Sequence, residues 1–498
     1  NYVIIQILKV SHLRTEQPYK MRHSSPTIRK EIWDTMPSAA AVRHVSECFV
    51  KPAGGGSFPE VPYSPWDYAL LSFHYIQKGH LFSKPTSSSF SVTSFLHHLK
   101  HSLSLTLVHF YPLAGRLVTS TTDDPPSSVV YIDCKNSPGA GLIHAAADLS
   151  IADILSPTYV PEVVQSFFDH DRAVNHDGHY RPLLTVQVTE LTDGIFLGYS
   201  LNHSVGDGTS FWAFLRLWSQ IFKDLKGQNE ESTIFPLPEF DRKVLNLSRR
   251  EYSIPYTHHD QFISRFERPY LKERFFHFSS ETIAKLKGRA NSEQNTDNIS
   301  SLQAVSALVW RSVTRARNVS KDDVTVCRLA CNLRTRMKPA VTSNYFGNFV
   351  FALMAKTTAG ELLENNLGWV ASKLHETVVE ANGEIARSWL ESWEESPRVY
   401  QLEKLVQSAA WSNGLMMGSS PRFDMYGIEF GLGKALAIRS GYANKFDGKL
   451  SLFPGRDGGG SMDLEVLLPP EVMAALEENT EFMDYAATPP HVYHLPSY

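Results

Sequence analysis

The chain has 498 residues, with 48 Lys plus Arg against 52 Asp plus Glu and a formal net charge of -4. Its 42% hydrophobic and 20% charged residues are typical of a globular protein rather than a disordered or fibrous one. Balanced charge without a basic block excludes a nucleic-acid binder, because phosphate binding needs clustered Lys and Arg. Four cysteines are too few for a disulfide scaffold in a chain this long, so we expect a reducing compartment, the cytoplasm.

The first 35 residues are predicted to be an extension outside the fold. Their apolar run, YVIIQILKV, is too short to span a membrane at about 20 residues per crossing, and we expect no membrane association. Acidic residues in the segment weaken the alternative of a plastid transit peptide, which is poor in acids. We therefore expect the first domain to begin at Met36.

Helix-like and strand-like segments alternate after Met36, which predicts a mixed α/β chain. Ser94 is a candidate N-cap for a helix, and the segments LLTVQVTEL and IFLGYSLNH flank a short Gly-containing turn, as expected for a strand pair. The helix predicted after Ser94 has apolar residues at helical spacing, namely Phe95, Leu96, Leu99 and Leu103.

Residues 223–276 are polar, punctuated by proline and without sustained periodicity. Long loops of this kind rarely lie inside one compact domain, so we expect a crossover linker between a domain at 36–222 and another at 277–498. Two amphipathic helices are predicted in the second domain, the first capped by Ser300 or Ser301. Their inward residues are Leu302, Val305, Leu308, Val309 and Val313, then Leu363, Val370, Leu374 and Val378.

Several well-known site motifs are missing from the sequence. It has no G-x-S-x-G elbow, dinucleotide fingerprint, Walker-type loop or H-E-x-x-H motif. Cys327 and Cys331 share a four-residue spacing but have no neighbouring Cys or His to complete a zinc site, so we predict no metal.

The pattern HxxxD occurs twice, at His144 and at His203, and a motif this short arises about once by chance in a chain with 20 histidines. His144 lies in an Ala-rich segment without turn signals and is interpreted as a structural histidine. His203 ends a predicted strand in a turn that Gly206 and Gly208 allow to bend, and its pKa near neutrality suits a general base. Asp207 could orient His203, but capping the next helix is the simpler interpretation of this residue.

Four ordered motifs together resemble the plant BAHD (HxxxD-type) family of acyl-CoA-dependent acyltransferases. They are HSVGDG at 203–208, FYPLAGRL at 110–117, NLRTRMKP with NYFGN between 332 and 348, and YGIEFGLGKA at 426–435. The segments GSSPRF and ANKFDGKLSLFPGRDGG are similar to a poorly characterised acetyltransferase-like branch of it. The resemblance covers about residue 36 to the C-terminus.

This resemblance implies two chloramphenicol-acetyltransferase-like domains of mixed sheets and flanking helices, with a channel between them. Acyl-CoA would be a co-substrate rather than a bound cofactor, and the acceptor would be a small hydroxylated or amine molecule of plant specialised metabolism. His203 would be the general base and Asp207 mainly structural. The family's usual monomer is expected here.

Two motifs depart from the family pattern. The DFGWG motif stands here as EFGLG, with Glu429, Phe430, Gly431 and Gly433, and we expect its acid to pair with Arg334 or Arg336 and to hold the domains together. A hydroxyl pair followed by Trp stands here as Ser419, Ser420, Pro421 and Arg422. A serine of this pair could donate to the oxyanion of the reaction, and a simple turn explains the same composition equally well.

For the CoA phosphates we consider Arg439, Ser440 and Lys445 at the channel mouth, because cationic and hydroxyl groups suit phosphate oxygens. Two alternatives to acyl transfer stay open. One is a CoA-independent lyase that acts on an acylated conjugate with the same histidine, and the other is a catalytically silent small-molecule binder.

Overall fold

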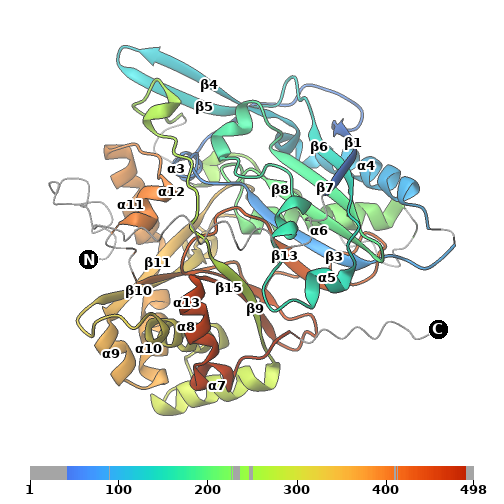
Figure 1. Cartoon of the computed structure of the whole chain (residues 1–498). Helices are drawn as coiled ribbons and strands as arrows, with labels where there is room; N and C mark the ends of the chain where they lie inside the picture. Colours follow the sequence, from blue (N-terminus) through green and yellow to red (C-terminus); the bar gives the residue numbers. More distant parts are fainter. Residues whose placement is uncertain are drawn as a thin grey trace, which may run out of the picture.

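The computed structural model describes residues 42–88, 90–225, 227, 236–245, 251–408, 411 and 413–489. The predicted extension at 1–35 lies outside these residues. Two six-stranded mixed sheets form the body of the protein, each with its own helices, so the predicted mixed α/β class with two sheets is confirmed. Figure 1 shows the first sheet with α4 and α6 in the upper half of the view, and the second with α7, α8 and α10 in the lower half.

The first sheet has the order β1-β6-β7-β8-β3-β13. It is formed by β1 (Arg43–Val50), β6 (Ala140–Ala146), β7 (Leu184–Glu190), β8 (Gly194–Leu201), β3 (Ile76–Ser83) and β13 (Ala437–Ser440). Helices α4 (Val92–His109) and α6 (Gly208–Leu225) contact each other and share one apolar core with the sheet. Burial of this core is the main stabilising contribution to this half of the protein.

The second sheet has the order β11-β10-β12-β14-β15-β9. It is formed by β11 (Val350–Thr358), β10 (Val324–Asn332), β12 (Gly414–Gly418), β14 (Lys449–Pro454), β15 (Met462–Leu468) and β9 (Lys272–Phe278). Its core includes apolar residues of α7 (Ser280–Glu293), α8 (Ser301–Arg317), α10 (Leu367–Glu380) and α13 (Pro470–Glu477).

A small third sheet and several short helices complete the described part. The sheet consists of β2 (Val61–Pro62), β5 (Pro126–Asp133) and β4 (Arg116–Asp123). The other α-helices are α3 (Pro65–Ala69), α5 (Ile151–Leu155), α9 (Ala359–Glu364), α11 (Gly383–Glu395), α12 (Leu402–Gln407) and α14 (Thr480–Met483). The 3₁₀ turns are η2 (Tyr111–Ala114), η3 (Glu162–Phe167), η4 (Asn175–His179), η5 (Arg242–Leu245), η6 (His259–Gln261) and η7 (Arg334–Arg336).

Most of the local sequence predictions are confirmed, with two corrections. β7 and β8 pair antiparallel, and α8 begins after Ser300, whose side chain accepts from Gln303 N in a capping box. The N-cap of α4 is Ser91 rather than Ser94, because the Ser91 side chain accepts from the Ser94 amide. Leu363 belongs to the short helix α9, while Val370 and Leu374 are buried on α10 as expected.

The expected domain boundaries are crossed at two places. β9 begins at Lys272, inside the expected linker. β13 lies in the second half of the chain but pairs antiparallel with β3 of the first sheet, with Ala437 opposite Leu81. The C-terminal part of the chain therefore completes the N-terminal sheet and ties the two halves together.

Among the helices of the described residues, none combines the length and the hydropathy that a membrane crossing requires.

Candidate active site

His203 lies in the turn between β8, which ends at Leu201, and α6, which begins at Gly208. The strand leading into it is buried along its whole length, so the turn starts from a rigid position. Its backbone N–H donates to Asn175 Oδ1 at 2.7 Å, and Asn348 Nδ2 donates to its carbonyl oxygen at 2.8 Å. The histidine backbone is thus held from both halves of the chain, since Asn348 comes from the segment before β11.

The Asn348 side chain is itself fixed by Asp67. The Asn348 amide donates to Asp67 Oδ1 at 3.0 Å, and the other carboxylate oxygen of Asp67 lies 3.0 Å from Arg242 Nη2. All three side chains are buried. Sequence reasoning missed Asn175, Asp67 and Arg242, and only the NYFGN motif at 344–348 pointed to Asn348.

Asp207 fixes the turn and does not hydrogen-bond His203. Its Oδ1 accepts from Ser210 N–H at 3.1 Å in the first turn of α6, and its Oδ2 accepts from Arg334 Nη1 at 2.7 Å and from Phe349 N–H at 3.0 Å. A carboxylate with these partners caps the helix and joins it to the second half of the chain. This geometry agrees with the simpler interpretation of Asp207.

Gly347 packs against the same turn. Its carbonyl oxygen accepts from Asp207 N–H at 3.2 Å, Ser210 Oγ at 3.0 Å and Arg334 Nη2 at 3.0 Å. A Cβ at this position would overlap the Tyr345 hydroxyl and the Arg242 guanidinium. A larger residue here would have to displace the Tyr345 ring or the Arg242 side chain, which pairs with the Asp67 carboxylate.

The electrostatics of the site favour a neutral histidine. Burial lowers the pKa of the His203 imidazole, the charge of Lys449 lowers it further, and Asp207 acts in the opposite direction. His203 Nδ1 is buried and hydrogen-bonds no other residue in the described part of the chain. The ring is therefore in the form that can accept a proton at neutral pH.

The loop after β12 carries the predicted Ser419, Ser420 and Arg422. Ser419 has a positive φ of 65°, and Ser420 Oγ accepts from Arg422 N–H at 3.2 Å, as in a simple serine turn. The loop reaches the histidine turn through Phe423, whose ring would lie 3.6 Å from a Cβ at Gly208. The structure thus brings this loop and the histidine turn together.

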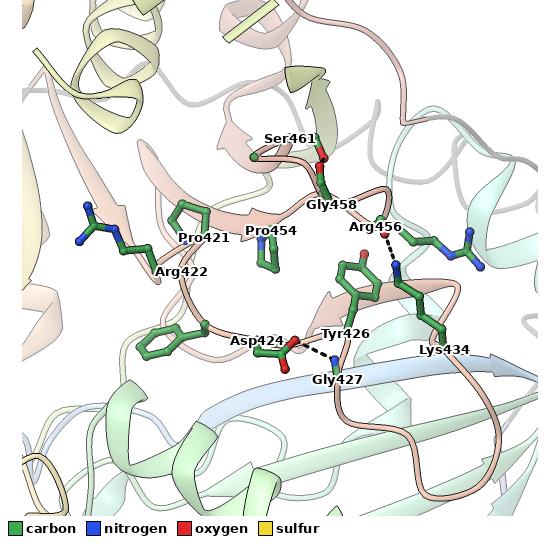
Figure 2. Close-up of a pocket in the computed structure, with 13 residues that line it drawn as sticks. Pro421, Arg422, Asp424, Tyr426, Gly427, Lys434, Pro454, Arg456, Gly458 and Ser461 are labelled. Atoms are coloured by element: carbon green, nitrogen blue, oxygen red, sulfur yellow. Dashed lines mark hydrogen bonds between the residues drawn. The ribbon is translucent and has the colours of Figure 1, made fainter. Parts of the chain in front are cut away.

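A pocket of about 450 Å³ lies beside this loop, between residues 421–434 and residues 454–461. Arg422, Lys434 and Arg456 are its cationic lining residues, and Asp424 is its acidic one. Figure 2 shows Asp424 and Tyr426 on one side of the pocket and Pro454 and Ser461 on the other. His203 does not line this pocket, but Phe423 does, and the same ring borders the histidine turn.

The family model described as "Transferase family" matches residues 40–483. An uncharacterized acetyltransferase of Arabidopsis thaliana is 34% identical, covering 84% of this chain and 93% of that protein. The BAHD acyltransferase DCR of Arabidopsis thaliana is 31% identical over 84% of this chain and 87% of its own. The chain belongs to the plant BAHD acyltransferase family. It is therefore an enzyme that transfers acyl groups.

Solved structures support the fold of this BAHD enzyme. Vinorine synthase superposes with a TM-score of 0.70 at 21% identity, covering 90% of this chain and 99% of its own. TRI101 of F. sporotrichioides, solved as a complex with coenzyme A and T-2, superposes with a TM-score of 0.65 at 18% identity over 86% of this chain and 99% of its own. Both likenesses extend across the two sheets.

The EFGLG motif of this BAHD chain docks on α6, but not through an arginine. Glu429 lies 3.2 Å from Lys223 Nζ, and the Phe430 ring packs on Trp218 with centroids 4.6 Å apart. The expected pairing with Arg334 or Arg336 is wrong: Arg334 pairs with Asp207, and Arg336 donates to the backbone carbonyl oxygens of Val378 and Ala381. The motif still joins the two halves of the enzyme, mainly by aromatic packing.

The expected CoA-phosphate residues are not at a channel mouth. Arg439, Ser440 and Lys445 are 6%, 4% and 4% exposed. Lys445 Nζ lies 2.6 Å from Glu273, Ser440 Oγ donates to Glu465, and the Arg439 guanidinium lies over the Phe275 ring. These contacts join the two sheets, and the expectation is corrected because all three side chains are buried.

Proposed function

We propose that this enzyme transfers an acyl group from an acyl-CoA thioester to a hydroxyl or amine of a small-molecule acceptor, with His203 as the general base. The observation that carries the proposal is the fixed position and the neutral state of His203. Its backbone is held by both halves of the chain, and burial keeps its imidazole neutral. A positioned neutral histidine is the group that acceptor activation needs.

In the proposed reaction, His203 takes the proton of the acceptor as its oxygen or nitrogen attacks the thioester carbonyl. The tetrahedral intermediate carries an oxyanion, and its collapse breaks the carbon–sulfur bond. His203 then returns the proton to the departing CoA sulfur. General base catalysis of this kind contributes about 10²- to 10⁴-fold to the rate.

Ser419 and Ser420 are the proposed donors to the oxyanion. Their loop packs on the histidine turn through Phe423, and the Ser420 hydroxyl accepts from Arg422 N–H, which leaves its own proton free to donate. A positioned donor is worth on the order of 3 kcal/mol to such a transition state. Asp207 is proposed as a positioning residue that acts through the turn.

We place the entry of acyl-CoA at the pocket beside this loop. Its lining includes the cationic residues Arg422, Lys434 and Arg456, and cations of this kind suit phosphate oxygens. The solved complex of TRI101 with coenzyme A supports CoA as the co-substrate for this fold.

A free-thiol release assay tests the proposal, with a panel of acyl-CoAs against hydroxylated and amine acceptors. His203→Gln should lose acceptor-dependent release by about 10²-fold or more. His144→Gln is the matched control, because His144 belongs to the other HxxxD pattern and pairs with Glu190 on the sheet at 2.7 Å. Equal loss in both variants, or no loss in His203→Gln, would refute the assignment.

We further propose that the enzyme acts as a monomer in the cytoplasm. All four cysteines are free, as a reducing compartment requires. Light scattering on the purified protein and imaging of a fluorescent fusion check the two statements.

A further inference from the structure

His80 is a fully buried histidine on β3, outside the histidine turn. Its ring packs among three aromatic rings, those of Phe82, Tyr199 and Trp212, with centroids 5.8, 5.7 and 5.9 Å away. Its Nε2 lies 2.9 Å from the carbonyl oxygen of Met425. A carbonyl oxygen only accepts, so Nε2 carries the hydrogen and donates it. This bond offsets the cost of burying a polar ring in an aromatic cluster.

The His80 ring is neutral at neutral pH. Burial lowers its pKa to about 4, against the opposing effect of the hydrogen bond to Met425. The other ring nitrogen, Nδ1, is buried and hydrogen-bonds no residue in the described part of the chain. His80 therefore acts as a fixed neutral donor, and its one hydrogen bond goes to Met425.

Met425 belongs to the segment 419–427, called here the serine loop because it carries the proposed oxyanion donors. The backbone hydrogen bonds within the loop are local, from Phe423 N–H to the Ser420 carbonyl oxygen at 3.2 Å and from Met425 N–H to that of Phe423 at 2.9 Å. Among the residues that the structure describes, His80 is the one side chain outside the serine loop that hydrogen-bonds it. The loop is thus tied to the first sheet through this histidine.

A second contact joins the serine loop to the histidine turn. The Trp212 ring, on α6, packs on His80 and also on Phe423, at 6.2 Å between the ring centroids. Phe423 in turn borders Gly208, where α6 begins. Figure 2 shows the chain between Asp424 and Gly427 beside a blue strand, the colour of β3 in Figure 1. β3 and α6 therefore hold the loop from two sides.

We infer that His80 is a positioning residue, which fixes the serine loop against the histidine turn and so places Ser419 and Ser420 for the oxyanion. His80 is buried and acts through Met425. A donor to the oxyanion works only at the right position, and a misplacement of about 1 Å can cost about 10²-fold in rate. This inference rests on the proposed function, since it depends on the proposed role of the two serines.

The first test measures steady-state thiol release by two variants of His80. His80→Leu removes the donor and leaves the buried Met425 carbonyl oxygen without its partner. We expect kcat to fall about 10- to 100-fold with a smaller change in KM, because the loss concerns the transition state. His80→Gln should recover most of this loss, because its side-chain amide also has an N–H that can donate to the carbonyl.

Phe82→Leu is the matched control for a general loss of stability. Phe82 is buried on the same strand and packs on the same ring, so this variant weakens the aromatic cluster but keeps the donor to Met425. It should lower the melting temperature and leave kcat close to the wild-type value. Hydrogen–deuterium exchange without substrate supplies the second test, in which peptides covering residues 419–427 should exchange faster in His80→Leu and unchanged in Phe82→Leu.

Wild-type kcat in His80→Leu, an equal fall of kcat in Phe82→Leu, or no recovery in His80→Gln would overturn the inference. Unchanged exchange of the serine loop in His80→Leu would overturn it as well. The exchange experiment does not require turnover. Absence of thiol release in the wild type, with faster loop exchange in His80→Leu alone, would therefore count against the proposed reaction and support the tie between His80 and the loop.

Discussion

The pair of Asp207 and Arg334 gives the sharpest test of how the site is built. Their side chains are 1% and 2% exposed, and Asp207 Oδ2 lies 2.7 Å from Arg334 Nη1. Removing one partner of a buried pair costs about 3–5 kcal/mol, because the other charge stays buried without compensation. Loss of the helix cap adds about 1 kcal/mol for Asp207.

We expect Asp207→Ala and Arg334→Met each to lower the stability by several kcal/mol, and the double variant to lose clearly less than the sum. For residues in direct contact the coupling reaches about 0.5–3 kcal/mol. Urea unfolding followed by circular dichroism gives the free energy of unfolding of the wild type, the two single variants and the double variant. These four values form a double-mutant cycle, from which the coupling energy is calculated.

Additive losses would refute the reasoning, because they would mean that the two side chains do not share one interaction. The pH dependence of activity separates this role from a direct action of Asp207 on His203. Asp207 raises the pKa of His203, so residual activity in Asp207→Asn should extend to lower pH rather than lose its dependence on the histidine.

Three further predictions concern the same site. Burial lowers the pKa of His203, so it stays a neutral base below pH 6.5, and the acid limb of kcat/KM should have its midpoint below 6.5; a midpoint above 7 would contradict this. Phe430→Ala should lower the free energy of unfolding in urea by about 3–5 kcal/mol, because its ring packs on Trp218. Glu429→Gln should lower it by at most about 1 kcal/mol, because its pair with Lys223 is partly exposed. A larger loss for Glu429→Gln than for Phe430→Ala would be inconsistent with docking by aromatic packing. Gly347→Ala should lower both melting temperature and turnover, and an unchanged melting temperature would show that the loop has room for a Cβ.

Local patterns in the sequence predicted local structure well. The helix α8 follows from its apolar spacing and the Ser300 cap, and the strands β7 and β8 follow from two apolar runs around a Gly-containing turn. The His203 turn could be located because glycines mark it, and because other family motifs accompany it in order.

Contacts between distant segments could not be predicted in the same way. Asp207 and Arg334 are 127 positions apart, and no periodicity links them. The strand β13 has only four residues, too few to show an alternating pattern, so its pairing with the first sheet could not be predicted from the sequence. Arg439 and Lys445 were misplaced because a charged residue in a sequence does not reveal whether its counter-charge lies in solvent or in the protein.

The central claim is that the enzyme transfers an acyl group from acyl-CoA to an acceptor, with His203 as the general base. Incubation with an acyl-CoA that carries an isotope label in the acyl group, followed by mass spectrometry of the acceptor, tests this most directly. The account predicts labelled acceptor in amounts equal to the free CoA released, with both lost in His203→Gln and kept in His144→Gln. Turnover of an acylated conjugate without CoA, or label transfer that survives in His203→Gln, would contradict it.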